Sequence, residues 1–249
     1  MMSDHVSERG DRFPITRLSA IVAAGSSDQA ERSRAFEALI AAYWMPVYKY
    51  TRIKWNKSSE DAKDLTQGFF TEAIEKNYFQ RYDASKAKFR TFLRTCLDGF
   101  VANQNKAASR IKRGGNAKLL SLDFEGAETQ LMNAAVPAAS AIDEYFEKEW
   151  ARSVLSLALD GFRAQMLEAG KTTHLRLFER FVLDEDDQPK TSYKALAAEF
   201  NISTSDVTNY LAGARREFRR LVLEKLRELT ATDEEFRREA RALLGVDAR

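Results

Sequence analysis

Residues 204 to 220 carry side chains of the two kinds that contact nucleic acids. Hydroxyl and amide groups hydrogen-bond to base edges, whereas guanidinium groups pair with phosphates. The candidates for base edges lie at the start of a predicted helix and outside its apolar stripe: Thr204, Ser205, Thr208 and Asn209. The candidates for phosphates lie farther along the same helix: Arg215, Arg216, Arg219 and Arg220. This combination indicates a surface for double-stranded DNA.

A helix-turn-helix would position these side chains, and the sequence from Tyr193 to Ala212 has its pattern. Asn201 occupies the turn position that needs a positive φ angle, and Ala197 is the small residue where the two helices approach. Ser203 is placed to cap the second helix, with Asp206 three residues later as in a capping box. The predicted apolar contacts between the helices are Leu196, Phe200, Ile202, Val207 and Tyr210.

Charge is segregated along the chain, although the formal net charge is only +2. Residues 86–113 contain a single acid, Asp98, whereas most of the charged residues in 114–149 are acids. A uniformly solvated surface would mix the two signs, so we expect a polyanion-binding face followed by a separate acidic segment. The cations of the first block are Lys86, Lys88, Arg90, Arg94, Lys106, Arg110, Lys112 and Arg113.

Helices are the only regular elements that the sequence predicts, so the expected fold class is all-α. Apolar residues from Phe36 to Val47 recur at helical spacings. Ser58, with Asp61 three residues later, predicts the N-cap of a helix that ends near Glu75. Further helices are predicted over residues 89–112, 143–169, 172–183 and 233–244.

Several kinds of chemistry are excluded by what the chain lacks. Cys96 is the only cysteine, and His5 and His174 are the only histidines. We find no catalytic Ser-His-Asp set, Gly-rich phosphate loop or metal-ligand spacing, and therefore predict no enzymatic activity, no metal and no cofactor. No run approaches the roughly 18 apolar residues of a membrane span, so we expect a cytoplasmic protein without a membrane partner.

Two stretches upstream of the helix-turn-helix add a family resemblance. They are DAKDLTQGFF from Asp61 to Phe70 and FRTFLRTCLDGFVANQ from Phe89 to Gln104. With the spacer and the helix-turn-helix, they resemble regions 2 and 4 of sigma-seventy-type transcription initiation factors of the extracytoplasmic-function (ECF) group. The resemblance implies two small helical domains joined by an acidic linker. The corresponding division is an N-terminal extension (1–29), a region 2-like domain (30–113), the linker (114–141), a region 4-like domain (142–230) and a tail helix (231–249).

The resemblance also implies a helix that docks on core RNA polymerase. Its contact residues would be Asp61, Asp64 and Gln67, and exposed acids suit a basic partner surface. Lys63 stands where many members carry an acidic residue, which weakens the charge complementarity. We therefore hypothesise that docking stays weak until charge is added nearby, for example by phosphorylation of Thr66.

Region 2 of this family also opens the promoter −10 element, which here would involve the loop at residues 77–88. Aromatic groups there would replace base stacking and cations would hold the separated strand, although some of these aromatics are also candidates for the core: Tyr78, Phe79, Tyr82, Lys86 and Lys88. The upstream duplex would meet one face of the following helix: Asn103, Lys106, Arg110 and Arg113. The acidic linker would imitate RNA inside the polymerase or serve as a solvated tether.

Promoter-specific initiation is the function that accounts for all these features. The protein would bind core RNA polymerase, recognise a −35 element as duplex DNA and help melt the −10 region to single strands. The alternative is a stand-alone helix-turn-helix regulator, and an enzyme with a fused DNA-binding domain is the weakest hypothesis. The alternative for the second helix of the motif is a plain amphipathic helix with a charged outer face, in which Glu217 and Glu224 pair with the neighbouring arginines. An anti-sigma protein and a kinase are candidate regulatory partners.

Overall fold

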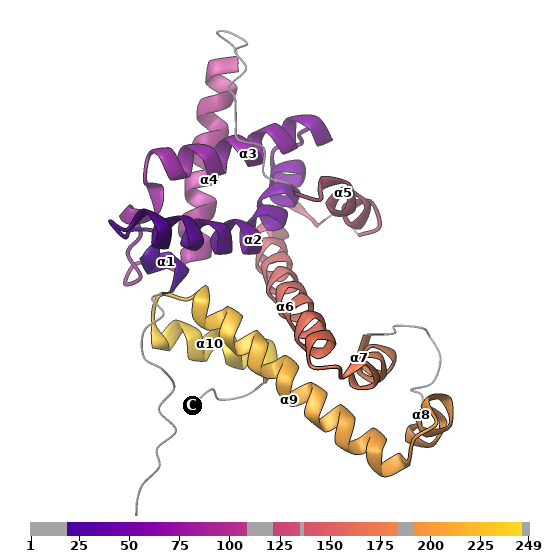
Figure 1. Ribbon diagram of the computed structural model, residues 1–249. Coiled ribbons are helices and arrows are strands. Elements are labelled where there is room, and N and C mark those ends of the chain that lie inside the picture. Colours follow the sequence, from indigo (N-terminus) through magenta and orange to yellow (C-terminus); the bar gives the residue numbers. More distant parts are fainter. Residues whose placement is uncertain (1–18, 109–121, 135–136, 184–191, 246–249) are drawn as a thin grey trace, which may run out of the picture.

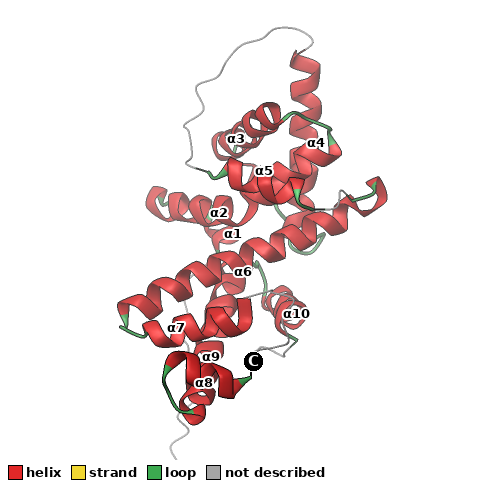
Figure 2. Cartoon of the chain, turned by 90° about the vertical axis from the view of Figure 1, so that its right-hand side faces the viewer, coloured by secondary structure: helices red, strands yellow, loops and turns green. Residues whose placement is uncertain are grey.

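The computed structural model describes residues 19–108, 122–134, 137–183 and 192–245, and all regular structure in these ranges is helical (Figure 2). The expected all-α fold class is therefore confirmed. The α-helices are α1 (Ala20–Ala23), α2 (Gln29–Lys54), α3 (Ser59–Glu75), α4 (Phe89–Ala108), α5 (Phe124–Met132), α6 (Ile142–Glu168), α7 (Thr172–Phe178), α8 (Tyr193–Phe200), α9 (Thr204–Glu228) and α10 (Asp233–Leu244). Two 3-10 turns and a π-helical segment accompany them: η1 (Tyr78–Arg81), η2 (Ala139–Ala141) and η3 (Glu179–Leu183).

Capping residues set where the helices begin. The hydroxyl of Ser58 accepts the backbone N–H of Asp61 at 3.1 Å, and α3 follows directly. Thr232 accepts the N–H of Glu235 at 3.1 Å in the same way before α10. A side-chain acceptor satisfies an N–H group that has no partner in the first turn of a helix. The helix predicted over residues 89–112 is α4, and its predicted end lies outside the described residues.

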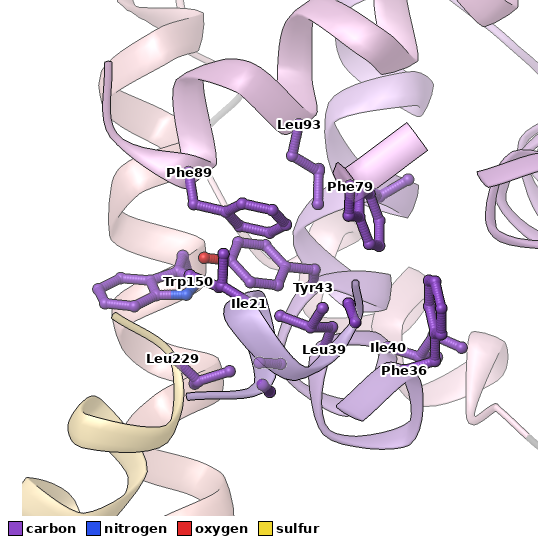
Figure 3. Packing of buried hydrophobic residues seen from close by; sticks show 14 of the residues in the cluster. Ile21, Phe36, Leu39, Ile40, Tyr43, Phe79, Phe89, Leu93, Trp150 and Leu229 are labelled. Atoms are coloured by element: carbon purple, nitrogen blue, oxygen red, sulfur yellow. The ribbon is translucent and has the colours of Figure 1, made fainter. Parts of the chain in front are cut away.

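The main hydrophobic core gathers side chains from both halves of the chain. Tyr43 of α2 is fully buried, and its ring centroid lies 5.5 Å from that of Phe89 on α4 and 6.4 Å from that of Trp150 on α6 (Figure 3). Leu229, just after α9, belongs to the same cluster. The expected arrangement of two small helical domains is therefore not confirmed, since both halves contribute to this core. Large apolar residues of α6 and α9 complete the core that α2 begins, because α2 and α6 pack along each other.

The segment predicted as a linker contains a docked helix. In α5 the ring of Phe124 lies edge-on against those of Trp44 and Tyr48, with centroid distances of 5.4 and 5.2 Å. Glu128 accepts hydrogen bonds from the Tyr48 hydroxyl at 2.6 Å and from Arg52 Nε at 3.0 Å. The acidic linker predicted over residues 114–141 is therefore not confirmed for residues 124–132, which form a helix whose aromatic ring and acid both pack on α2.

Two long helices, α6 and α9, run side by side from the main core toward α7 and α8 (Figure 1). At that far end, Phe162 and Phe178 form one small cluster and Leu196 belongs to another. α9 passes both clusters and ends in the main core, where Val222 and Leu226 are completely buried. The first turns of α9 are therefore fixed relative to the rest of the described chain.

Candidate nucleic-acid interface

The turn between α8 and α9 has the geometry that its sequence predicts. Asn201 adopts a φ angle of 52° and ends α8 in the left-handed region, which asparagine tolerates better than most residues. Ser203 then caps α9: its hydroxyl accepts the Asp206 N–H at 3.0 Å, and the Asp206 carboxylate accepts the Ser203 N–H at 3.2 Å. This reciprocal capping box fixes the direction in which α9 leaves the turn.

A small apolar core holds the two helices of this motif together. Leu196 and Val207 are fully buried, and Ala197, at the close approach, is 8% exposed. Leu177 of α7 and Leu211 of α9 complete the buried set. The other predicted contacts, Phe200, Ile202 and Tyr210, are half-buried around it, together with Phe181 and Tyr193. The structure therefore has the two helices and the tight turn that the sequence predicts over residues 193–212.

The first turns of α9 present polar side chains to solvent. All four residues predicted to face base edges are exposed: Thr204, Ser205, Thr208 and Asn209. The hydroxyl of Thr208 donates to the Thr204 carbonyl at 3.0 Å, so its oxygen can still accept a hydrogen bond from a group outside the helix. The helix begins at an extremity of the molecule, where α8 and α9 meet (Figure 1). Its start is therefore accessible to a groove.

The four arginines of α9 that are predicted to meet phosphates fall into three groups. Arg216 and Arg219 are exposed, and no ion pair within the described ranges involves them. The Arg215 guanidinium lies 5.1 Å from the centroid of the Phe181 ring. Arg220 is held by Glu217, at 2.6 Å, and by Glu224. The two acids of the amphipathic alternative thus neutralise Arg220, whereas Arg216 and Arg219 stay exposed on the outer face.

His174, for which the sequence predicts no role, packs against the helix-turn-helix from α7. The ring of His174 on α7 stacks on Tyr210 of α9, with centroids 3.9 Å apart and an interplanar angle of 23°. Burial, together with the nearby Lys171, lowers the pKa of His174 below its ordinary value. Neutral imidazole stacks on an aromatic ring without desolvating a charge, so this contact is structural.

Three cations of the basic block before the linker are neutralised by acids from other parts of the chain. Arg90 is 3% exposed, and its guanidinium lies 2.6 Å from Glu147 and 3.1 Å from Glu239. Arg94 pairs with Asp143 at 3.2 Å, and Lys88 with Glu239 at 3.0 Å. The segregated charges of the sequence therefore meet each other across the fold. The expectation of a free polyanion-binding face is wrong for these cations.

The aromatic residues of the 77–88 loop are less accessible than predicted. Phe79 is 3% exposed and packs on Phe36 and Phe89, so the prediction that it stacks on a separated base is wrong for this conformation. Tyr78 and Tyr82 are half-buried. Burial and a hydrogen bond to a carboxylate raise the pKa of Tyr78 to about 12, and burial raises that of Tyr82 to about 12.

The remaining −10 candidates lie toward the end of α4 and beside the loop. Asn103 and Lys106 are exposed on α4. Lys86 is also exposed and lies 3.2 Å from Asp83. The other two predicted duplex contacts, Arg110 and Arg113, lie outside the described residues.

The predicted docking helix α3 has exposed acids on one side, three of them near its start and one at its end. Asp61 and Asp64 are exposed, and so are Glu60 and Glu75, which the sequence analysis did not single out. Helical spacing places all four on one side, and no ion pair within the described ranges involves them. Gln67 is only 8% exposed, so it is not placed for a contact in this conformation.

Two neighbouring residues correct the hypothesis about charge on α3. Lys63 lies 5.8 Å from the centroid of the Phe124 ring, on the side that faces α5. It therefore does not interrupt the acidic face. Thr66 is fully buried and its hydroxyl donates to the Ala62 carbonyl at 2.7 Å, so this conformation does not offer it to a kinase.

Comparison of the chain with protein-family models, curated proteins and solved structures gives no match. Within the described ranges, no cluster of three or more His, Cys, Asp or Glu residues is arranged to hold a metal ion. The helices of those ranges also include none with the length and apolar character to span a membrane.

Proposed function

We propose that this protein is a promoter-specific transcription initiation factor that binds core RNA polymerase, recognises a −35 element and helps melt the −10 region. The observation that carries the proposal is the start of α9. A capped, rigidly held helix presents Thr208 and Asn209 at its tip, with unpaired Arg216 and Arg219 farther along. Short polar groups suit base edges in a major groove, and free guanidinium groups suit the flanking phosphates.

The acidic face of α3 supports a protein partner in addition to DNA. Four exposed carboxylates on one helix repel DNA, so this surface suits a basic protein surface. Replacing Asp61 and Asp64 together by Asn is expected to weaken binding to core polymerase without affecting duplex DNA binding. Glu125→Gln with Glu168→Gln is the charge-matched control, because both side chains are exposed and lie on other helices. Equal loss in both double variants would count against a specific docking face.

The second candidate function is a stand-alone helix-turn-helix regulator. One observation favours it: Arg90, Arg94 and Lys88 are engaged by the chain's own acids and not presented to DNA. Run-off transcription with purified cognate core polymerase and a promoter library separates the two functions. An initiation factor makes core polymerase start at defined sites. If transcripts match those of core polymerase alone while the protein selects duplex sites, the regulator is correct.

Substitution of two adjacent arginines, Arg219 and Arg220, tests the DNA contacts. Arg219→Gln should reduce the slope of log Kd against log salt by about 0.9, because one phosphate contact is lost. Arg220→Gln should change it less, since Glu217 and Glu224 already engage Arg220. Asn209→Ala should instead alter which duplex sequences are selected. Identical salt slopes for both arginine variants would remove Arg219 from the interface.

A further inference from the structure

Arg215 of α9 is held by a neighbouring side chain that does not neutralise it. Arg215 is exposed, and its guanidinium lies over the ring of Phe181, 5.1 Å from the centroid. No ion pair in the described ranges involves it. A phenyl ring attracts a cation through its π face but offers no oxygen acceptor. The N–H donors of Arg215 therefore stay available to a ligand.

Arg220 shows the opposite arrangement on the same helix. Its guanidinium donates to the Glu217 carboxylate at 2.6 Å, so its charge and its donors are already engaged. Arg216 and Arg219 are a third case, because they are exposed and no ring or ion pair in the described ranges holds them. Of the four arginines predicted to meet phosphates, only Arg215 combines a fixed position with free donors in the part of the chain that the structure describes.

Phe181 is itself fixed by the helix-turn-helix. It lies on η3, the π-helical segment that follows α7, and it borders the small core around Leu196 and Val207. The ring of Tyr193, the first residue of α8, meets it edge-on, with centroids 5.4 Å apart and an interplanar angle of 70°. Such a contact favours one orientation of the two rings. The ring beside Arg215 is therefore held by both η3 and α8.

Arg215 continues the line of two residues predicted to face base edges. Spacings of 4 and 7 residues place Thr204, Thr208 and Arg215 along one side of α9. At about 1.5 Å per residue, Arg215 lies about 10 Å beyond Thr208 along the helix axis. The major groove is about 12 Å wide, so a residue at this distance from the bases comes near the backbone that borders the groove. The position of Arg215 therefore suits a phosphate contact.

Holding the guanidinium in advance favours such a contact. A free arginine side chain loses rotamer freedom when it binds, and this loss weakens binding. A side chain that already rests on a ring loses less. Orientation matters as well, because a guanidinium pairs with phosphate oxygens through two parallel N–H groups. An exposed cation–π contact is expected to change the affinity by a factor of about three.

We infer that Phe181 is a positioning residue for DNA binding, which holds the guanidinium of Arg215 toward a phosphate at the edge of the groove that receives α9. Phe181 acts through Arg215 and needs no contact of its own with DNA. Duplex binding by α9 is part of the proposed function, and this role of Phe181 rests on it. The predicted helix-turn-helix begins at Tyr193, so its pattern does not include Phe181.

A double-mutant cycle tests this role. Phe181→Leu keeps an apolar side chain but removes the ring, and its effect is compared in the parent and in Arg215→Gln. The probe is a fluorescently labelled duplex DNA of randomised sequence, because phosphate contacts do not depend on base sequence. Phe181→Leu should weaken binding about threefold in the parent and leave the affinity of Arg215→Gln unchanged. Phe181→Tyr keeps a ring and should bind as the parent does.

Phe200→Leu is the matched control. Phe200 is half-buried at the border of the same small core, and its ring also lies near an arginine, with Arg176 of α7 at 5.6 Å from the centroid. Its loss loosens that core without removing the ring beside Arg215. Hydrogen exchange over residues 193–211 shows whether each variant keeps a folded helix-turn-helix. Phe181→Met replaces Phe181→Leu if the latter loses this protection.

A loss that Phe181→Leu causes only when Arg215 is present, together with equal effects of Phe200→Leu in both backgrounds, supports the positioning role. Equal losses from Phe181→Leu in both backgrounds overturn it, because the ring then acts through the core. No loss in either background overturns it as well. Failure in run-off transcription, with the cycle as expected, counts against the proposed function and not against Phe181. Absence of duplex binding by the parent overturns both.

Discussion

At the outer part of α9, Arg216 and Arg219 extend into solvent, whereas at the start of α4 Arg90 is 3% exposed and lies between Glu147 and Glu239. Both regions are rich in arginine in the sequence. Only the first keeps its cations available to a ligand, because taking a charge out of water requires an opposite charge nearby. A basic stretch therefore identifies a nucleic-acid surface only where the fold leaves it unpaired.

The two regions also differ in how their cores are built. The helix-turn-helix has a small hydrophobic core of its own, centred on Leu196 and Val207. The first half of the chain shares its core with α6 and α9, through Trp150 and Leu226. We therefore expect a destabilising substitution in the helix-turn-helix to unfold only that region. A substitution around Arg90 should destabilise the whole described chain.

The largest effect is expected from Arg90→Met. Removing the guanidinium leaves Glu239 buried without its main counter-charge, which should lower the free energy of unfolding by roughly 3 kcal/mol or more. Arg216→Met is the control, and it should leave stability nearly unchanged because Arg216 is exposed. The free energy of unfolding of both variants is measured by urea unfolding, with circular dichroism as the signal. Equal midpoints for the two variants would show that the ion pairs around Arg90 do not join the halves.

A somewhat smaller effect is expected from Leu196→Ala. The side chain is fully buried in the helix-turn-helix, so its truncation should cost about 3 kcal/mol. Native-state hydrogen exchange should show lost protection over residues 193–211, while α2 and α6 keep theirs. Lys194→Ala, at an exposed position on the same helix, is the control. Loss of protection that extends to α2 would mean that the two regions unfold as one unit.

Asn201→Ala should have an effect of about 1 kcal/mol, because alanine is less tolerant than asparagine of the left-handed region. Asn201→Gly should be close to neutral, since glycine adopts a φ angle of 52° without strain. Thermal unfolding of the pair separates the turn geometry from the loss of the amide side chain. Equal destabilisation by alanine and glycine would assign the effect to the side chain instead.

The smallest effect is a pH dependence at His174. Its folded-state pKa is lowered, so the contribution of its stack on Tyr210 is fully present above the ordinary pKa of histidine, about 6.5. That contribution is lost as the pH falls through the folded-state pKa, because the unfolded chain binds the proton more readily. Between pH 7.5 and 5.5 the melting temperature should fall by about 1 °C more in the parent than in His174→Gln. A larger fall in the variant would contradict the assignment.

Local chemistry determined the parts of the site that the sequence predicted. Ser58, Ser203 and Thr232 bond to backbone N–H groups three residues later, and the positive φ angle of Asn201 is a property of one residue. Helical spacing likewise determined which residues of α9 lie outside its apolar stripe. Such features require only neighbours in the sequence, so the helix-turn-helix and most helix boundaries follow from the residues alone.

The tertiary structure decided which charges are free and which aromatic residues are accessible. Arg90 and Glu239 are separated by 149 positions along the chain, and no periodicity indicates that they meet. Phe79 and Tyr82 belong to one short loop, yet the first is buried among rings from α2 and α4 while the second borders a hollow beside α10. Burial and ion pairing depend on packing between distant segments, and that packing decides which charged surfaces stay open to a ligand and which the chain itself covers.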